Sequence, residues 1–147
     1  MVRPKIKTPC IGVCSTGIGD SVCRGCKRFS HEIIDWNGYT NLQKQAVTDR
    51  LELLLVQVVD DKFSVLDETQ LRGQLVAKQV RFNPAQNPLC WVFDLLKAGA
   101  SQIDDFRLFG VGVKSRWREH SASDLRDLID ADYYALSCAH HQRYFLL

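Results

Sequence analysis

Apolar residues recur at helical spacing through most of the chain, and the longest such run follows Thr40. Thr40 and Gln43 form a capping-box pattern, in which each side chain accepts a hydrogen bond from the other residue's backbone N–H. A helix that begins here and ends before Asp60 places its apolar residues on one face. We expect that face to be buried, with these members: Leu42, Ala46, Leu51, Leu54, Leu55 and Val58.

A shorter helix is expected just before it. Ser30 is a favourable N-cap, Glu32 falls in the positive first turn, and Asn37-Gly38 is a typical helix end. The residues that this helix is expected to contribute to a core are Ile33, Ile34 and Trp36.

The second half alternates short apolar runs with turn and cap signals, among them the caps Asp67 and Asn87-Pro88. An extended segment is expected over 63–66, followed by a helix over 68–80 with Leu71, Leu75, Val76 and Val80 inward. A strand over 71–82 is the alternative to this helix. The later elements are an apolar helix from Leu89 to Lys97, a strand or extended loop over 106–113, and a last helix from Ser123.

These patterns predict a mainly α protein with a small four-cysteine metal knuckle at the N-terminus and a possible small β element in the second half. We divide it into a flexible basic arm over 1–9, a knuckle with two helices over 10–60, and a mainly helical region over 61–147.

Composition places the chain among ordinary globular proteins. It has 147 residues, of which 46% are hydrophobic, and no run approaches the roughly 18 apolar residues of a membrane-spanning helix. Nor does an apolar run follow the basic N-terminus, as it does in a signal peptide. We therefore expect a cytoplasmic protein that does not act at a membrane.

The charge is uneven along the chain. Residues 1–50 carry eight Lys and Arg against four Asp and Glu, whereas residues 51–147 carry eleven against thirteen. Four thiolates around a divalent metal have a formal charge of about −2, which gives basic residues beside such a site an electrostatic reason to be there. The basic first third is therefore weak evidence for binding nucleic acid.

Four of the six cysteines are crowded into 17 residues, which is the main chemical signal of the sequence. Two close thiol pairs, separated by a glycine-containing loop of eight residues, can surround one metal ion. The predicted ligands are Cys10, Cys14, Cys23 and Cys26. The alternative is a small core of buried free thiols.

Zinc is the favoured metal, because a close thiol pair that leads into a helix is how many structural zinc sites place their ligands. Iron, as a single ion or in an iron–sulfur cluster, is the alternative, since four sulfurs also suit it. The spacing of three, eight and two intervening residues matches neither common ferredoxin pattern.

The stretch P-C-I-G-V-C, then C-R-G-C-K-R and H-E-I-I-D-W, resembles a bacterial domain-of-unknown-function family, DUF1289, over about residues 8–55. Its members are commonly labelled predicted iron–sulfur proteins. The resemblance implies that the family's signature residues here are Pro9, Cys10, Cys14, Cys23, Gly25, Cys26, Glu32, Ile33 and Trp36. Lys27 stands where the family usually has glycine, and residues 61–147 lie outside the resemblance.

Basic and aromatic residues beside the cysteines make nucleic-acid binding a further alternative. The proposed nucleic-acid or partner contacts are Arg24, Lys27, Arg28, Phe29 and Trp36, and a second patch consists of Lys114, Arg116, Trp117 and Arg118. The net charge of only +2 argues against this alternative.

The remaining cysteines and histidines are interpreted as structural. Cys90 lies in an apolar helix and is expected in its core, while Cys138 and His141 lie near the end of the last helix, where the helix dipole favours histidine. His31 is expected to be exposed rather than to support the metal site.

No catalytic constellation accompanies the cysteines. We therefore expect a metal-binding accessory or interaction protein without enzymatic activity, which acts with a protein partner. A redox protein using the same cysteines is the competing hypothesis, and nucleic-acid binding the third.

Overall fold

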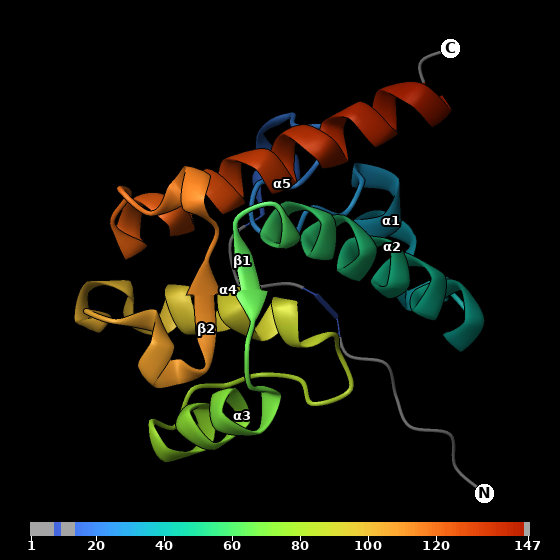
Figure 1. Ribbon diagram of the computed structural model, residues 1–147. Coiled ribbons are helices and arrows are strands. Elements are labelled where there is room, and N and C mark those ends of the chain that lie inside the picture. Colours follow the sequence, from blue (N-terminus) through green and yellow to red (C-terminus); the bar gives the residue numbers. More distant parts are fainter. Residues whose placement is uncertain (1–7, 10–13, 146–147) are drawn as a thin grey trace, which may run out of the picture. The chain divides into compact units, whose positions relative to one another are not determined.

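The structure is a computed structural model that describes residues 8–9 and 14–145 of the chain, and the side chains of Ile18, Tyr144 and Phe145 are not considered. The fold is mainly helical with one small two-stranded sheet, as predicted (Figure 1). The chain forms two compact units, one of residues 1–54 and 133–147 and the other of residues 55–132, which we call unit 1 and unit 2. The domain boundaries expected after residues 9 and 60 stay predictions.

Unit 1 contains a 3-10 helix η1 (Ser15–Ile18), the short helix α1 (Ser30–Asp35), a 3-10 turn η2 (Trp36–Gly38) and most of the long helix α2 (Asn41–Asp60). The predicted capping box of α2 is present, because the backbone N–H of Thr40 donates to Gln43 Oε1 (2.8 Å) and that of Gln43 donates to Thr40 Oγ1 (3.1 Å). The N-cap of α1 is Phe29, so Ser30 is its first helical residue.

The buried face of these helices differs from the predicted one. Ile34 and Leu42 are 77% and 84% exposed, and Ala46 is exposed as well, so the expectation that they are buried was wrong. Leu51, Leu54 and Val58 of α2 are buried as predicted, and Lys44, Val47 and Val59 are buried as well. In the first turn of α2, where Leu42 lies, an apolar residue can face solvent without breaking the helical pattern.

Unit 2 is built on the antiparallel pair β1 (Phe63–Val65) and β2 (Val111–Val113), in which Phe63 faces Val113. The 3-10 helix η4 (Phe106–Phe109) leads into β2 through Gly110. Gly110 has φ +70°, and a Cβ there would meet the Asp67 carbonyl oxygen at 2.5 Å, so glycine is required. The sequence predicted one extended stretch over 106–113, whereas its first half is 3-10 helix.

Helices α3 (Glu68–Ala77) and α4 (Pro88–Gly99) begin at the predicted caps, because the side chains of Asp67 and Asn87 accept hydrogen bonds from Gln70 N and Leu89 N. Leu71 and Leu75 are buried, but Val76 is 64% exposed and Val80 is only half-buried. The helix expected over 68–80 is confirmed as far as Ala77, and the alternative of a strand over 71–82 was wrong. The core of unit 2 includes six residues of α4: Cys90, Trp91, Val92, Phe93, Leu95 and Leu96.

The last helix, α5 (Ala122–Phe145), begins beside Ser121, whose hydroxyl accepts from Asp124 N at 3.0 Å. Its first half buries Leu125 and Ile129 in unit 2, and its second half belongs to unit 1. Within the described residues, no helix is both long enough and apolar enough to cross a membrane.

Candidate metal centre

Residues 22–29 form a tight knuckle, which we define as the turn that carries Cys23 and Cys26. Val22 and Phe29 close it as an isolated antiparallel bridge, and Cys23 N donates to the Arg28 carbonyl at 2.9 Å. Within the turn, Lys27 N donates to the Cys23 carbonyl at 2.8 Å. These bonds hold both cysteines on one rigid turn, independently of any regular helix or sheet.

Lys27 closes the knuckle in a left-handed conformation, with φ +67°. A side chain with a Cβ is strained there, and the glycine that the resemblance implies for this position would avoid that strain. The ammonium group offsets that strain, because Nζ donates to the carbonyls of Arg24 and of Gly25 (3.2 Å). The side chain is 1% exposed, so a cation lies buried within the turn that carries the two thiols.

The sulfur of Cys23 is surrounded by hydrogen-bond donors. Burial by itself raises the pKa of this thiol, but hydrogen bonds from the backbone N–H groups of Cys26, Ser15 and Gly25 to the sulfur outweigh burial and lower the pKa from 9.0 to about 7. Such a ring of N–H groups stabilises a thiolate, which is the form that binds metal. Cys26 also hydrogen-bonds the sulfur, so the two cysteines of this pair are brought together.

Cys26 has a different environment. Burial raises the pKa of its thiol, while the guanidinium of Arg28, whose Nε donates to Sγ at 3.3 Å, acts in the opposite direction. Arg28 is itself 3% exposed, and its guanidinium also lies 4.9 Å from the Trp36 ring centroid. A buried guanidinium thus faces a sulfur that can carry the compensating negative charge.

Of the first cysteine pair, the structure describes Cys14. Ser15, which follows Cys14, links this segment to the knuckle, because its backbone N–H reaches the sulfur of Cys23 and its hydroxyl accepts from Arg24 N at 2.8 Å. Cys14 itself is exposed, and its sulfur lies 2.9 Å from the Thr16 hydroxyl.

Cys10 lies outside the described residues, so the full predicted ligand set stays a prediction. Among the residues that are described, no three His, Cys, Asp or Glu side chains form a group that could hold a metal ion. The donors of the second pair fit a thiophilic metal, since two close sulfurs lie among N–H groups and cations.

Glu32 attaches the knuckle to α2 by a buried network. Its carboxylate accepts hydrogen bonds from the backbone N–H of Phe29 (2.8 Å) and from both terminal nitrogens of Arg50, at 2.6 and 2.7 Å. The Arg50 guanidinium lies 4.0 Å from the Phe29 ring centroid. A bidentate pair of this kind fixes both distance and orientation, so α1 and α2 are locked beside the turn.

The second half of α5 completes the surroundings of the knuckle within unit 1. The Lys27 ammonium lies 5.3 Å from the Tyr133 ring centroid, and the Phe29 ring meets His141 edge-on at 5.0 Å. The Tyr133 hydroxyl donates to the Leu51 carbonyl at 3.1 Å. The helix therefore contacts both the knuckle and α2, a role that the predicted dipole effect on His141 did not include.

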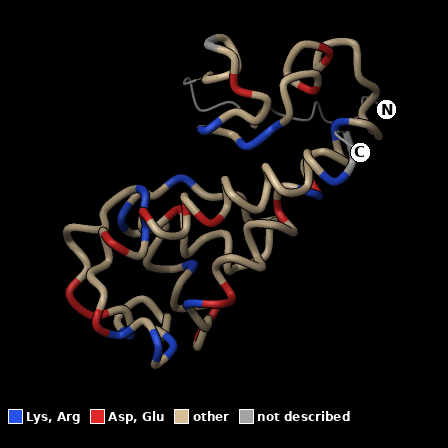
Figure 2. The backbone as a smooth tube through the Cα atoms, turned by 90° about the horizontal axis from the view of Figure 1, so that it is seen from above, with Lys and Arg blue, Asp and Glu red and all other residues tan. Residues whose placement is uncertain are grey.

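Most residues proposed as nucleic-acid or partner contacts are buried. Lys27, Arg28, Phe29 and Trp36 are each 7% exposed or less, while Arg24 is exposed and pairs with Asp20 at 3.2 Å. Figure 2 shows Lys and Arg positions interspersed with Asp and Glu along the tube rather than gathered in one basic run. The buried four support the fold of the knuckle and are not available to stack on a base.

Sequence reasoning missed Arg50, which holds the site, and it missed the structural role of Lys27. Arg50 lies 18 residues from Glu32, and a long-range pair leaves no local pattern. The signal for the left-handed conformation of Lys27 was the glycine that the resemblance implies at this position.

Residues 8–54 match the family model described as a protein of unknown function, DUF1289. This confirms the suspected resemblance over its stated part of the chain. No curated protein matches the chain, and no solved structure matches it.

Proposed function

We propose that unit 1 is organised by one structural metal ion, with zinc the favoured metal, held by Cys10, Cys14, Cys23 and Cys26. The knuckle carries this proposal: one hydrogen-bonded turn directs the sulfurs of Cys23 and Cys26 toward each other, and backbone N–H groups donate to the Cys23 sulfur. Four thiolates would close the coordination shell and leave no open position for catalysis.

The buried cations favour a metal over free thiols. Arg28 is buried with its Nε on the Cys26 sulfur, and Lys27 is buried in the same turn. Beside a neutral thiol, the Arg28 guanidinium has less compensation for its desolvation than beside a thiolate. A four-thiolate centre with a formal charge of about −2 offsets both charges, which gives a reason for their burial.

An iron or iron–sulfur centre at the same cysteines is the second candidate. The observation that favours it is the set of backbone N–H groups around the Cys23 sulfur, because hydrogen bonds to sulfur tune the reduction potential of such centres. In that case the neighbouring cations would raise the potential by stabilising the more negative, reduced state.

We further propose that the protein is an accessory module that binds a protein partner. Ile34 is 77% exposed and contributes to a depression in unit 1 that also includes Tyr39 and Gln43. Large apolar side chains exposed to solvent are a feature of protein-binding surfaces. The burial of Lys27, Arg28, Phe29 and Trp36 makes nucleic acid a weaker candidate than a protein.

Elemental analysis combined with an absorption spectrum tests the metal proposal on full-length protein purified without oxygen. We expect about one zinc per chain and a colourless solution, and loss of the metal in Cys23→Ser. The matched control is Cys90→Ala, which removes a buried thiol of α4 and should keep the metal. Visible absorption with stoichiometric iron would establish the second candidate, and protein without zinc or iron would refute both.

A further inference from the structure

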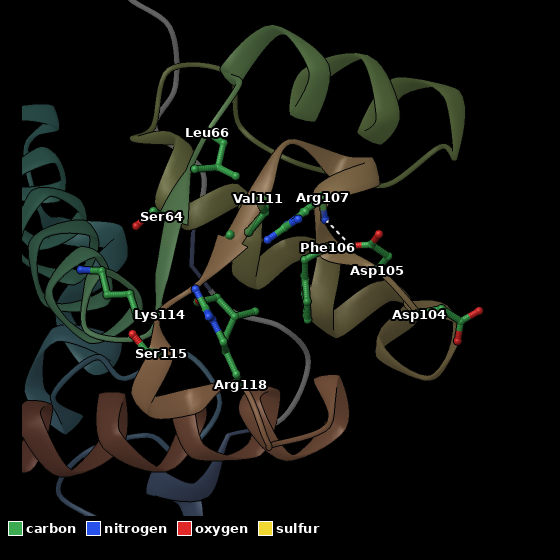
Figure 3. Close-up of a pocket in the computed structure, with 12 residues that line it drawn as sticks. Ser64, Leu66, Asp104, Asp105, Phe106, Arg107, Val111, Lys114, Ser115 and Arg118 are labelled. Carbon is green, nitrogen blue, oxygen red and sulfur yellow. Dashed lines mark hydrogen bonds between the residues drawn. The ribbon is translucent and has the colours of Figure 1, made fainter.

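Unit 2 contains an open cavity of about 750 Å³ that the sequence did not suggest (Figure 3). It lies against the sheet and is bordered by η4 and by the 3-10 turn η5 (Ser115–Trp117) that follows β2. The volume is within the range of roughly 300 to 1,000 Å³ that is usual for small-molecule sites. Its lining combines apolar side chains with three cations.

Arg107 is the first of two cations directed into this cavity. Its backbone is firmly placed, because its N–H donates to Asp105 Oδ1 (2.9 Å) and its carbonyl accepts from Gln70 Nε2 (3.2 Å) and from Gly110 N (3.1 Å). Figure 3 shows the guanidinium extending along the face of β2 beside Val111. The side chain thus projects from a backbone that these hydrogen bonds hold in place.

Arg118 is the second, and it reaches the same face of β2 from the residue after η5 (Figure 3). Its Nε donates to the Val113 carbonyl at 3.4 Å, which orients the guanidinium beside β2 in the lining of the cavity. The third cation, Lys114, interacts with Asp60. Its Nζ donates to the Asp60 carbonyl and lies 3.7 Å from Asp60 Oδ1.

Neither guanidinium forms an ion pair within the part of the chain that the structure describes. The two carboxylates of the lining are placed differently: Asp105 accepts from the backbone N–H of Arg107 rather than from its guanidinium, and Asp104 points away from β2 in Figure 3. Two cations that line one cavity repel each other, and an oxyanion between them removes that repulsion. Guanidinium groups also match the geometry of phosphate and carboxylate.

The apolar part of the lining indicates what the anion is attached to. Leu66 is 63% exposed at the cavity, and Phe106 is half-buried in its lining. We propose that this cavity binds a small organic molecule with a phosphate or carboxylate group, its oxyanion held by Arg107 and Arg118 and its apolar body lying against Leu66 and Phe106. This site is separate from the cysteines and independent of any metal.

An NMR titration of the full ¹⁵N-labelled chain tests this proposal. The probes are phenyl phosphate, benzoate and inorganic phosphate, each compared with chloride at equal ionic strength. We expect at least one of the two organic probes to shift the backbone amides of Arg107, Gly112 and Val113 in a saturable way, and to bind at least about threefold more tightly than inorganic phosphate because its ring covers apolar surface.

Arg107→Gln and Arg118→Gln should each weaken binding about tenfold, since each removes one charge-assisted contact. Both side chains are exposed, so the variants should keep the wild-type spectrum elsewhere. The control is Arg126→Gln, an exposed arginine of the same unit that pairs with Asp127, which should bind as wild type. Equal binding of inorganic phosphate, no saturable shift with either organic probe, or undiminished binding by both cavity variants would overturn the proposal.

Discussion

The two units of the protein differ in what they bury. Around the cysteines, unit 1 buries the charged side chains of Lys27, Arg28, Glu32 and Lys44. Unit 2 buries mainly aliphatic and aromatic side chains, and Lys62 is its buried charge among the described residues. The largest of its fully buried side chains are Trp91, Lys62, Phe63, Leu71, Leu75, Leu96, Leu125, Ile129, Val59 and Val92.

This difference indicates two sources of stability. Unit 2 gains free energy from apolar burial, which needs no cofactor. In unit 1, charged groups that are removed from water need compensating charges and hydrogen bonds. Lys62 in unit 2 has such compensation from Asp132 at 2.7 Å, whereas Arg28 in unit 1 faces the sulfur of Cys26. We therefore expect unit 1 to depend on the metal and unit 2 to be independent of it.

The largest effect is expected from Cys26→Ser. Metal binding in small structural sites is worth roughly 10 kcal/mol or more and is largely folding free energy, so loss of one ligand should unfold residues 10–40 locally. Hydrogen exchange read by mass spectrometry would detect lost protection of α1. Unchanged protection in α1 would contradict this prediction, and Cys138→Ala provides the control.

Leu71→Ala should destabilise unit 2 and leave the metal site of unit 1 intact. Leu71 is fully buried in unit 2, and truncation of such a leucine costs about 3 kcal/mol. We expect faster hydrogen exchange in α3 and α4 with an unchanged metal content. If the variant lost its metal, the two units would not be independent in stability. Val76→Ala, at an exposed position of the same helix, is the control.

Glu32→Gln tests the charged network of unit 1 without touching a cysteine. The substitution breaks the buried bidentate pair with Arg50 and leaves that guanidinium without its anion, which costs about 3 kcal/mol. Native-state hydrogen exchange should show a lower opening free energy in α1 and α2. Asp127→Asn, which removes an exposed partner of Arg126, should change stability by less than about 0.5 kcal/mol.

The smallest effect concerns the backbone of Lys27. Lys27→Ala and Lys27→Gly both lose the ammonium contacts, but only alanine retains the left-handed strain. We expect the alanine variant to be about 1 kcal/mol less stable than the glycine variant in opening of the knuckle. Equal stabilities would show that the conformation at this residue is not strained.

The caps of α2, α3 and α4 were predicted well because their signals are local, whereas Ser30, expected to cap α1, is its first helical residue. Thr40 with Gln43, Asp67 and Asn87 each form the predicted hydrogen bond within three residues along the chain. Burial was predicted less well: Leu42 and Val76 fit an apolar face by spacing, yet they lie where no other element covers them. Spacing gives the direction of a side chain, but only the tertiary fold decides whether that direction is covered.

The residues of the candidate site show the same difference between local contacts, which were predicted, and long-range contacts, which were not. Cys23 and Cys26 were identified as a pair because two intervening residues bring both onto one turn. The pair of Glu32 and Arg50 and the contact of Phe29 with His141 join distant parts of the chain, so no sequence pattern contained them. Arg28 was predicted to lie beside the thiols, but its burial against Cys26 was not foreseen.

Hydrogen exchange with and without a strong metal chelator is the most direct test of the claim that a metal organises unit 1 but not unit 2. Full-length protein would be compared before and after chelation, with peptides covering α1 and α4 as the two readouts. We predict that chelation removes protection from α1 while α4 exchanges as before. Protection of α1 that survives verified removal of the metal, or equal loss in α1 and α4, would contradict the account.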